Sequence, residues 1–191
     1  MKLILGSTSK PRQQILRKLG FKFSVIQVEI DEKKFRAKDP KKHVLKLAHA
    51  KAIAIQKITP IVSKEGILVT CDQIAYCNGK ILEKARDLKE AEKFIRSYSN
   101  NVVDNISAIA LTNLATGKQI GGVDNLKIEF KKFDEKLVKR ALAEKNLLSY
   151  SGATCFGHTF WQSYMKKLSG DKSILFGISV KLMKKLINEV K

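Results

Sequence analysis

The sequence lacks long hydrophobic runs. No stretch of its 191 residues approaches the ~20 apolar residues that a membrane-spanning helix requires. The opening residues, MKLILGS, place only a short apolar run after one lysine, which is too little for the hydrophobic segment of a signal peptide. We therefore expect a cytoplasmic protein that has no membrane partner.

Cysteine is also scarce. Cys71, Cys77 and Cys155 are odd in number and form no CxxC motif or paired histidine spacing, which argues against a disulfide framework and against a zinc site. We predict that they are reduced packing residues. Internal repeats, low-complexity tracts and linkers are absent as well, and 44% apolar residues suffice for one substantial core. We expect a single domain over residues 1–191, in which any two lobes are interleaved.

Acidic residues are few compared with basic ones. The chain has 18 Asp and Glu but 37 Lys and Arg, which leaves a formal net charge of +19. Such a charge favours phosphate-bearing partners: nucleotides, nucleic acid or an anionic membrane surface. The lysines are spread along the chain, so a lysine-rich composition explains the charge equally well. No RNP, KH or helix-turn-helix signature supports nucleic acid, which the sequence therefore disfavours.

Hydrophobic periodicity and turn signals predict an α/β chain with a mixed sheet. Strands are expected at residues 2–7 and 21–30, as two segments around Asp72, and as a pair at 104–114 and 120–133. A hairpin turn is expected at Asn78-Gly79. Helices are predicted after a Ser9 cap up to Gly20, at 40–55 after an Asp39 cap, at 87–97, after Asp134, and at 179–190. Residues 149–171 suggest loops and one short strand.

The first candidate site is the cationic, hydroxyl-lined start of the first helix. Ser7, Thr8, Ser9, Lys10 and Arg12 surround a helix N-terminus, whose free N–H groups and positive dipole suit a phosphate. The stretch lacks the glycines of a P-loop or of a dinucleotide-binding fingerprint. Phosphate binding and a plainly capped helix with a solvated basic edge both remain open.

Lys51 is the second candidate, because it lies within an apolar stripe. Val44, Ala48 and Ile55 flank it at helical spacing, so its ammonium group lies on the buried face. Either the side chain extends past the stripe to solvent, or it meets a ligand phosphate or a buried carboxylate.

Asp72 is the third candidate. It directly follows the apolar run ILVTC, where an unpaired carboxylate would be costly. A structural ion pair and a catalytic role explain it equally well. Its candidate partners are Lys51, Lys84, Arg12 and a divalent metal ion, with Asp31 and Glu32 as further carboxylates.

Five short motifs follow one another along the chain: GSTSKPR at 6–12, IDE at 30–32, KLAHAKA at 46–52, CDQ at 71–73 and LEKA at 82–85. In this order they resemble the Maf family of nucleoside triphosphate pyrophosphatases, which is related in fold to the inosine triphosphate pyrophosphatases. The resemblance covers nearly the whole chain. It implies an elongated central mixed sheet flanked by helices, with a cleft between two lobes, and it suggests a homodimer.

The resemblance also implies roles. Asp72 matches the general base that activates water for attack on the α-phosphorus of a nucleoside triphosphate, which releases pyrophosphate and a nucleoside monophosphate. Glu32 matches an acidic residue that, with Asp72, helps to hold Mg²⁺ or Mn²⁺. The substrate-binding positions are Ser7, Ser9, Arg12, Lys51, Gln73 and Lys84.

Two positions bear on the choice of base. Gln73 matches the subgroup associated with 7-methyl-GTP, whereas the subgroup associated with dTTP and UTP has threonine there. Pro11 occupies the family's other specificity position and matches neither subgroup. The resemblance therefore favours a methylated or otherwise modified purine, and a pyrimidine remains open.

Several positions depart from the family pattern. Gln13 replaces the second cation of an arginine pair, and Gly157 or His158 stands where the family has Gln or Glu. Residues 83–85 and 177–179 replace GKP and GLP. These changes leave open a catalytically weakened relative that binds nucleotides without useful turnover. The net charge of +19 separately leaves open a basic nucleic-acid-binding domain.

The histidines and aromatics near these positions are ambiguous. His158 either donates to the nucleobase or phosphate or, more commonly for such surroundings, packs against its aromatic neighbours. Of Phe156, Phe160 and Trp161, we expect at least two in the core. His43 and His49 are predicted to face solvent.

Overall fold

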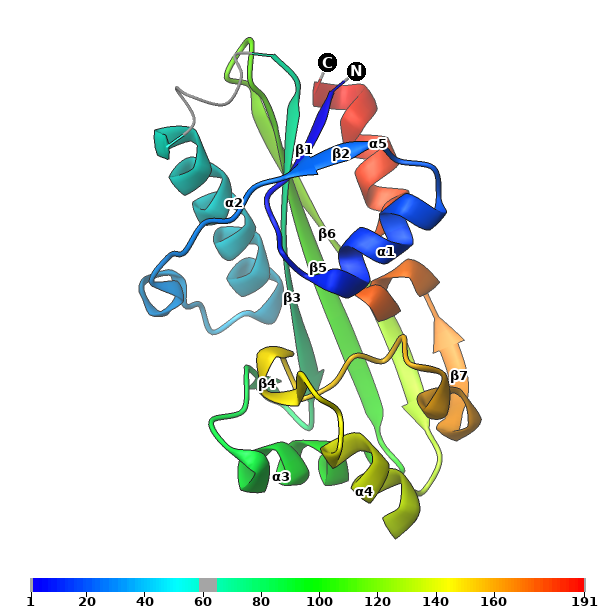
Figure 1. The fold of residues 1–191 in the computed structure, drawn as a ribbon. Coiled ribbons are helices and arrows are strands. Elements are labelled where there is room, and N and C mark those ends of the chain that lie inside the picture. The colour runs from blue at the N-terminus through cyan, green and yellow to red at the C-terminus, as the bar shows by residue number, and fades with distance from the viewer. Residues whose placement is uncertain (1, 59–64, 191) are drawn as a thin grey trace.

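The structure is a computed structural model that describes residues 2–58 and 65–190, and it shows an α/β chain (Figure 1). The strands are β1 (Leu3–Leu5), β2 (Phe23–Val25), β3 (Ile67–Cys77), β4 (Lys80–Leu82), β5 (Val102–Asn113), β6 (Gln119–Phe130) and β7 (Met165–Ser169). The α-helices are α1 (Lys10–Lys18), α2 (Pro40–Ile58), α3 (Leu88–Tyr98), α4 (Glu135–Leu142) and α5 (Val180–Val190). Short 3₁₀ helices are η1 (Glu32–Phe35), η3 (Leu147–Ser149), η4 (Thr159–Tyr164) and η5 (Lys172–Phe176).

The strands form one mixed sheet in the order β2-β1-β3-β5-β6-β7, with β4 added beside β3. β1 runs parallel to β2 and to β3, and the remaining pairs are antiparallel. β3, β5 and β6 extend along the length of the molecule (Figure 1). The predicted elongated mixed sheet is thus confirmed.

Helices cover both faces of the upper sheet. α2 lies on one face, and α1 and α5 lie on the other (Figure 1). Because side chains alternate along a strand, the even-numbered residues 68–74 of β3 face α2, and the odd-numbered residues 67–71 face α1 and α5. Ile74 accordingly shares a buried cluster with Ala48 of α2. Cys71 shares another with Leu16 of α1 and Met183 of α5.

The lower end of the sheet has its own aromatic core, beside α3 and α4. Tyr98, Phe130, Phe156 and Trp161 are each at most 2% exposed, and their rings pack against one another. The prediction that at least two of the three late aromatics are core residues is confirmed by Phe156 and Trp161. Phe160 is half-buried.

A gap in the sheet edge divides the molecule into two lobes. β1 pairs with β3 over residues 67–69, and β4 pairs with it over 75–77. Within the described part of the chain, no strand covers residues 70–74 on that edge, and Asp72 lies at the centre of the gap. The expected cleft therefore lies at this gap, between the ends of β1 and β4 on the edge of β3.

Local turn and cap signals were read correctly at most points. Asn78 and Gly79 have the positive φ angles of a tight hairpin, 50° and 74°. Asp39, Asp87 and Asp134 each accept a backbone N–H at the start of a helix, at 2.7–2.8 Å. All three cysteines are free and buried, as predicted.

Some boundaries were wrong. The second strand is Phe23–Val25 rather than 21–30, because the chain leaves the sheet after Ile26 and lines the cleft. Asp31 consequently caps η1 and Glu32 is its first residue, so neither lies at a strand end. β3 runs unbroken through Asp72 instead of forming two segments. Ser9 precedes α1, but its side chain makes no capping bond.

Across residues 2–58 and 65–190, we find no helix that combines the length and apolarity needed to cross a membrane.

Candidate functional site

A cavity of about 950 Å³ occupies the gap between the lobes. Its walls come from the β1–α1 junction, the segment 27–36, α2, the centre of β3, the segment after β4, and the later segments 146–156 and 175–177. Every site residue predicted from the sequence lines this cavity: Ser7, Ser9, Pro11, Arg12, Glu32, Lys51, Asp72, Gln73 and Lys84.

Lys51 and two carboxylates form the centre of the site. Lys51 Nζ lies 2.6 Å from Asp72 Oδ1 and 3.0 Å from Glu32 Oε1. The side chains of Lys51 and Asp72 are only 16% and 11% exposed. The ammonium group within the apolar stripe of α2 thus meets a buried carboxylate, one of the two readings that the sequence left open.

The pKa values of this cluster follow from its charges. Burial alone would lower the pKa of Lys51, but the adjacent carboxylates of Asp72 and Glu32 outweigh burial and raise it. Burial would raise the pKa of Glu32, but Lys51 lowers it below its ordinary value of 4.5. Lys51 is therefore charged at neutral pH, and so is Glu32.

Arg12 connects α1 to the open edge of β3. Its Nε donates to the Gly177 carbonyl at 2.8 Å, and its Nη1 donates to Ser7 Oγ at 3.1 Å and to the Cys71 carbonyl at 3.3 Å. The Cys71 carbonyl lies in the gap between β1 and β4, so the guanidinium satisfies an acceptor that no strand covers.

Gln13 points away from the cavity. It is 7% exposed, donates to the Ser7 carbonyl at 3.4 Å and accepts from Arg17 at 3.2 Å. The position where the family has a second cation therefore contacts the backbone of the loop before α1 instead of lining the cavity. Lys10 and Lys33 also line the cavity and bring further positive charge to it.

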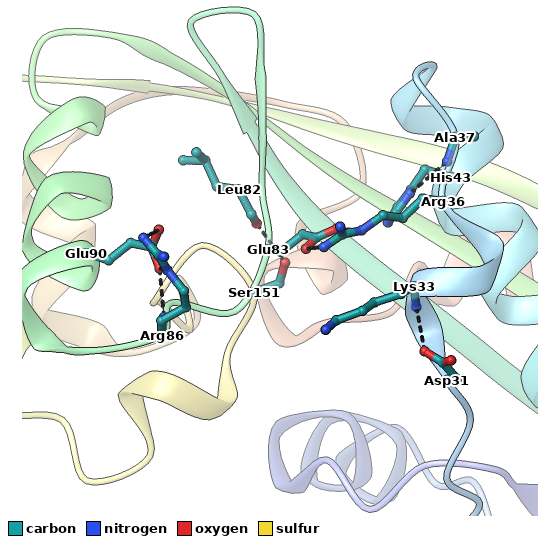
Figure 2. Close-up of polar contacts among 10 residues, drawn as sticks. All are labelled: Asp31, Lys33, Arg36, Ala37, His43, Leu82, Glu83, Arg86, Glu90 and Ser151. Carbon is teal, nitrogen blue, oxygen red and sulfur yellow. Dashed lines mark hydrogen bonds and ion pairs between the residues drawn. The ribbon is translucent and has the colours of Figure 1, made fainter.

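An ion pair joins the segment after η1 to the segment after β4, and both of its residues line the cavity. Arg36, just after η1, binds both carboxylate oxygens of Glu83, just after β4 (Figure 2). Figure 2 also shows that the Lys33 side chain extends toward Ser151, while its backbone N–H binds Asp31. Glu83 stands at a departure from the family pattern, so sequence reasoning gave no reason to expect this bridge.

Lys84 is held at the opposite wall by backbone pairing. It forms an isolated β-bridge with Ser151, whose hydroxyl donates to the Leu82 carbonyl at 2.9 Å. Within the described residues, its ammonium group makes no hydrogen bond or ion pair. It is therefore available for a ligand in the cavity.

His158 lies outside the cavity lining. Its Nδ1 is 2.9 Å from Glu144, and its ring meets Tyr150 and Phe160 edge-on. Of the two readings left open for His158, the packing one fits this position.

The prediction that His43 faces solvent is wrong. The residue is 3% exposed, lines the cavity and accepts the Ala37 N–H at 3.3 Å. The segment 27–36 folds back over the first turn of α2 and buries it. His49 is half-buried and lies 2.7 Å from Gln119 Oε1.

Asn105 is a cavity residue that sequence reasoning missed. It is 2% exposed, lies on β5 and binds the Gln73 side chain. A polar residue inside the apolar run of a central strand was the available signal, since a buried amide requires a partner.

The carboxylates of Glu32 and Asp72 suit a divalent metal only together with a substrate. No group of three or more acidic, histidine or cysteine side chains within 2–58 and 65–190 forms a metal cage. Both carboxylates nevertheless lie near one another, since each contacts Lys51 Nζ. Mg²⁺ commonly takes one or two carboxylates plus phosphate oxygens and water, so the two residues fit part of a divalent-metal site.

Acid should remove the contribution of Glu32 to stability. Its folded pKa is lowered, so the Lys51 contact stabilises the protein above pH 4.5 and loses its effect as pH falls through the folded pKa. We expect the melting-temperature difference between wild type and Glu32→Gln to shrink below pH 4.5. Glu29→Gln, on the same exposed segment, is the control. A difference that stays constant from pH 7 to pH 3 would contradict this assignment.

Comparisons with known proteins identify relatives of this chain. The family model for Maf-like proteins matches residues 2–190. The chain is 29% identical to the 7-methyl-GTP pyrophosphatase of Dictyostelium discoideum, over 98% of this chain and 96% of that protein. It is also 29% identical to the dTTP/UTP pyrophosphatase of Pyrococcus abyssi, over 97% of this chain and 94% of that protein. Among solved structures, a HAM1 protein from Coxiella burnetii matches with a TM-score of 0.43 and 13% identity, over 68% of this chain and 73% of that one.

Proposed function

The chain belongs to the Maf family, and we propose that this nucleoside triphosphate pyrophosphatase cleaves its substrate between the α- and β-phosphates with Asp72 as general base. The observation that carries the proposal is the Lys51–Asp72 pair at the open edge of β3, inside a cavity large enough for a nucleotide. Water attacks the α-phosphorus, and pyrophosphate leaves.

Asp72 supplies the proton acceptor. Lys51 binds Oδ1, and Oδ2 makes no hydrogen bond with the described residues, so it is free to accept a proton from the attacking water. Lys51 holds the carboxylate in place and adds positive charge near the phosphorus, where negative charge develops.

The phosphate chain lies along the start of α1 and the opposite wall. The first turn of α1 has no acidic residue and lines the cavity beside Ser7 and Ser9. Pro11 has no N–H, so the N–H groups of Lys10 and Arg12, which precede the first helical bond made by Gln13, are the donors left for a phosphate. Arg12 and Lys84 contact phosphate oxygens from the two walls. Lys10 and Lys33 supply the charge that Gln13 does not.

Glu32 and Asp72 would hold a divalent cation, Mg²⁺ or Mn²⁺. The bound cation supplies charge neutralisation at the phosphates. Lys51 contacts both carboxylates, so it would have to share them with the cation once a nucleotide is bound.

Gln73 and Pro11 contribute to the choice of base. The names of the relatives divide between 7-methyl-GTP and dTTP/UTP, and glutamine after the general base favours the first group. We propose a methylated purine nucleoside triphosphate as the preferred substrate.

Product identity tests the proposal. Purified protein with Mg²⁺ or Mn²⁺ should convert 7-methyl-GTP, UTP or dTTP to the monophosphate and pyrophosphate, which chromatography separates from a diphosphate and orthophosphate. Saturable nucleotide binding without products would instead identify a weakened binder. Salt-sensitive binding to RNA or DNA that free nucleotide does not displace would identify a nucleic-acid-binding domain.

A further inference from the structure

A glutamine held in one orientation lies on the face of β3 opposite Asp72. Gln73 Nε2 donates to Asn105 Oδ1 and, at 3.2 Å, to the Ile174 carbonyl. Asn105 Nδ2 donates to the same carbonyl at 3.2 Å. Three segments, β3, β5 and η5, therefore share one closed network of hydrogen bonds.

The Ile174 carbonyl fixes how both amides are turned. A carbonyl oxygen can only accept, so the groups that face it must be the two NH₂ groups. Rotating the Gln73 amide would place its oxygen against both the Ile174 and the Asn105 oxygens. Such buried acceptors without donors are costly, so the amide stays as it is.

This orientation leaves one polar atom of Gln73 unused. Both N–H donors of Nε2 are occupied, and Oε1 makes no hydrogen bond with residues 2–58 or 65–190. Gly177, at φ 98°, keeps the approach open, because a Cβ at that position would lie only 3.0 Å from Oε1. Gln73 thus presents an acceptor and no donor.

The surroundings of Oε1 suit a flat ring. Leu175 and Phe176, which lie between the Ile174 carbonyl and Gly177, both line the cavity, as does Phe156. An apolar wall beside a single fixed acceptor is typical of a pocket for a heteroaromatic base.

We propose that Gln73 Oε1 accepts a hydrogen bond from a ring N–H of the nucleobase, and that Asn105 is the positioning residue that keeps the amide turned this way. The inference rests on the proposed function and adds a rule to it. Guanine and uracil carry a ring N–H on their Watson–Crick edge, whereas adenine and cytosine carry an acceptor at the equivalent nitrogen. The site should therefore prefer nucleobases that carry this ring N–H.

Two substrate pairs test the rule. In wild type, kcat/KM should favour UTP over CTP and GTP over ATP by about tenfold or more, the effect of one satisfied instead of one opposed hydrogen bond. Asn105→Leu removes one of the two acceptors that hold the Gln73 amide and leaves the Ile174 carbonyl, so both ratios should fall by about threefold. Ser107→Ala, two residues along the same buried strand, leaves the network intact and should keep both ratios.

A second variant and a binding measurement make the test decisive. Gln73→Met removes the acceptor and should bring both kcat/KM ratios close to one, even if Asn105→Leu fails to fold. Calorimetry with the α,β-methylene analogues of the four triphosphates gives the same ratios without turnover. Binding ratios that fall in the variants without any hydrolysis support the rule and overturn the proposed function.

The opposite results overturn the rule. Hydrolysis with ratios near one in wild type would do so and leave the proposed function standing. Unchanged ratios in folded Asn105→Leu and Gln73→Met would do the same. A wild-type protein that neither binds nor hydrolyses these four nucleotides or 7-methyl-GTP overturns both.

Discussion

Asp72→Asn should lower kcat by about 10²- to 10⁴-fold, the usual contribution of a general base. The amide keeps the shape of the side chain and its place on β3 but cannot accept the proton from water. Lys51 retains Glu32 at 3.0 Å, so the protein should still fold and bind nucleotide. Pyrophosphate release at saturating substrate measures kcat, and calorimetry with a non-hydrolysable analogue measures affinity.

Asp104→Asn is the matched control. Asp104 is also partly buried in the central sheet, accepts from Asn125 at 2.6 Å and lies outside the cavity. Its substitution should leave kcat within about twofold of wild type, as for a polar change away from the site. If Asp72→Asn retained wild-type turnover, the base would have to be another group, and the mechanism proposed for the Lys51–Asp72 pair would be wrong.

Local chemistry made part of this site readable from the sequence. Asn78-Gly79 permits the positive φ angles of a tight turn, and each helix-capping aspartate carries an acceptor for free N–H groups. Lys51 stood out because a cation within an apolar helical stripe requires a partner. Asp72 stood out for the same reason within an apolar strand, and the two groups meet at 2.6 Å.

Features that depend on non-local pairing were not readable. The gap in the edge of β3 exists because β1 and β4 are both short and pair with opposite ends of the same strand. No property of residues 70–74 predicts this gap. The burial of His43 and the Arg36–Glu83 bridge likewise depend on how the segment 27–36 folds back, which no periodicity in that segment encodes.

Asn105 combines a local feature that the sequence shows with a non-local contact that it does not show. Its polarity within the run VVDNISAIAL was visible, and a buried amide needs a partner, but sequence reasoning did not single it out. The identity of that partner depends on the register of β3 against β5, in which Gln73 lies opposite Ser107, two residues from Asn105. The sequence could therefore mark the position but not its contact.

Lys51→Met should lower the free energy of unfolding by about 3 kcal/mol, the cost of leaving a buried carboxylate without its partner. Asp72 is 11% exposed and would lose its ion pair, while Glu32, at 44%, can turn to solvent. Denaturant unfolding at pH 7 measures the loss. Lys46→Met, on the exposed face of the same helix, should change stability by less than about 0.5 kcal/mol.

A double substitution separates the charge from the packing. In an Asp72→Asn background the carboxylate is absent, so Lys51→Met should cost at least about 1 kcal/mol less than it does in wild type. Equal costs in the two backgrounds would mean that Lys51 stabilises the fold through its aliphatic stem alone. A reduced cost would show that the Lys51–Asp72 ion pair contributes to the stability of α2 packed on β3. The folded protein would then hold Asp72 in place for the reaction before any nucleotide binds.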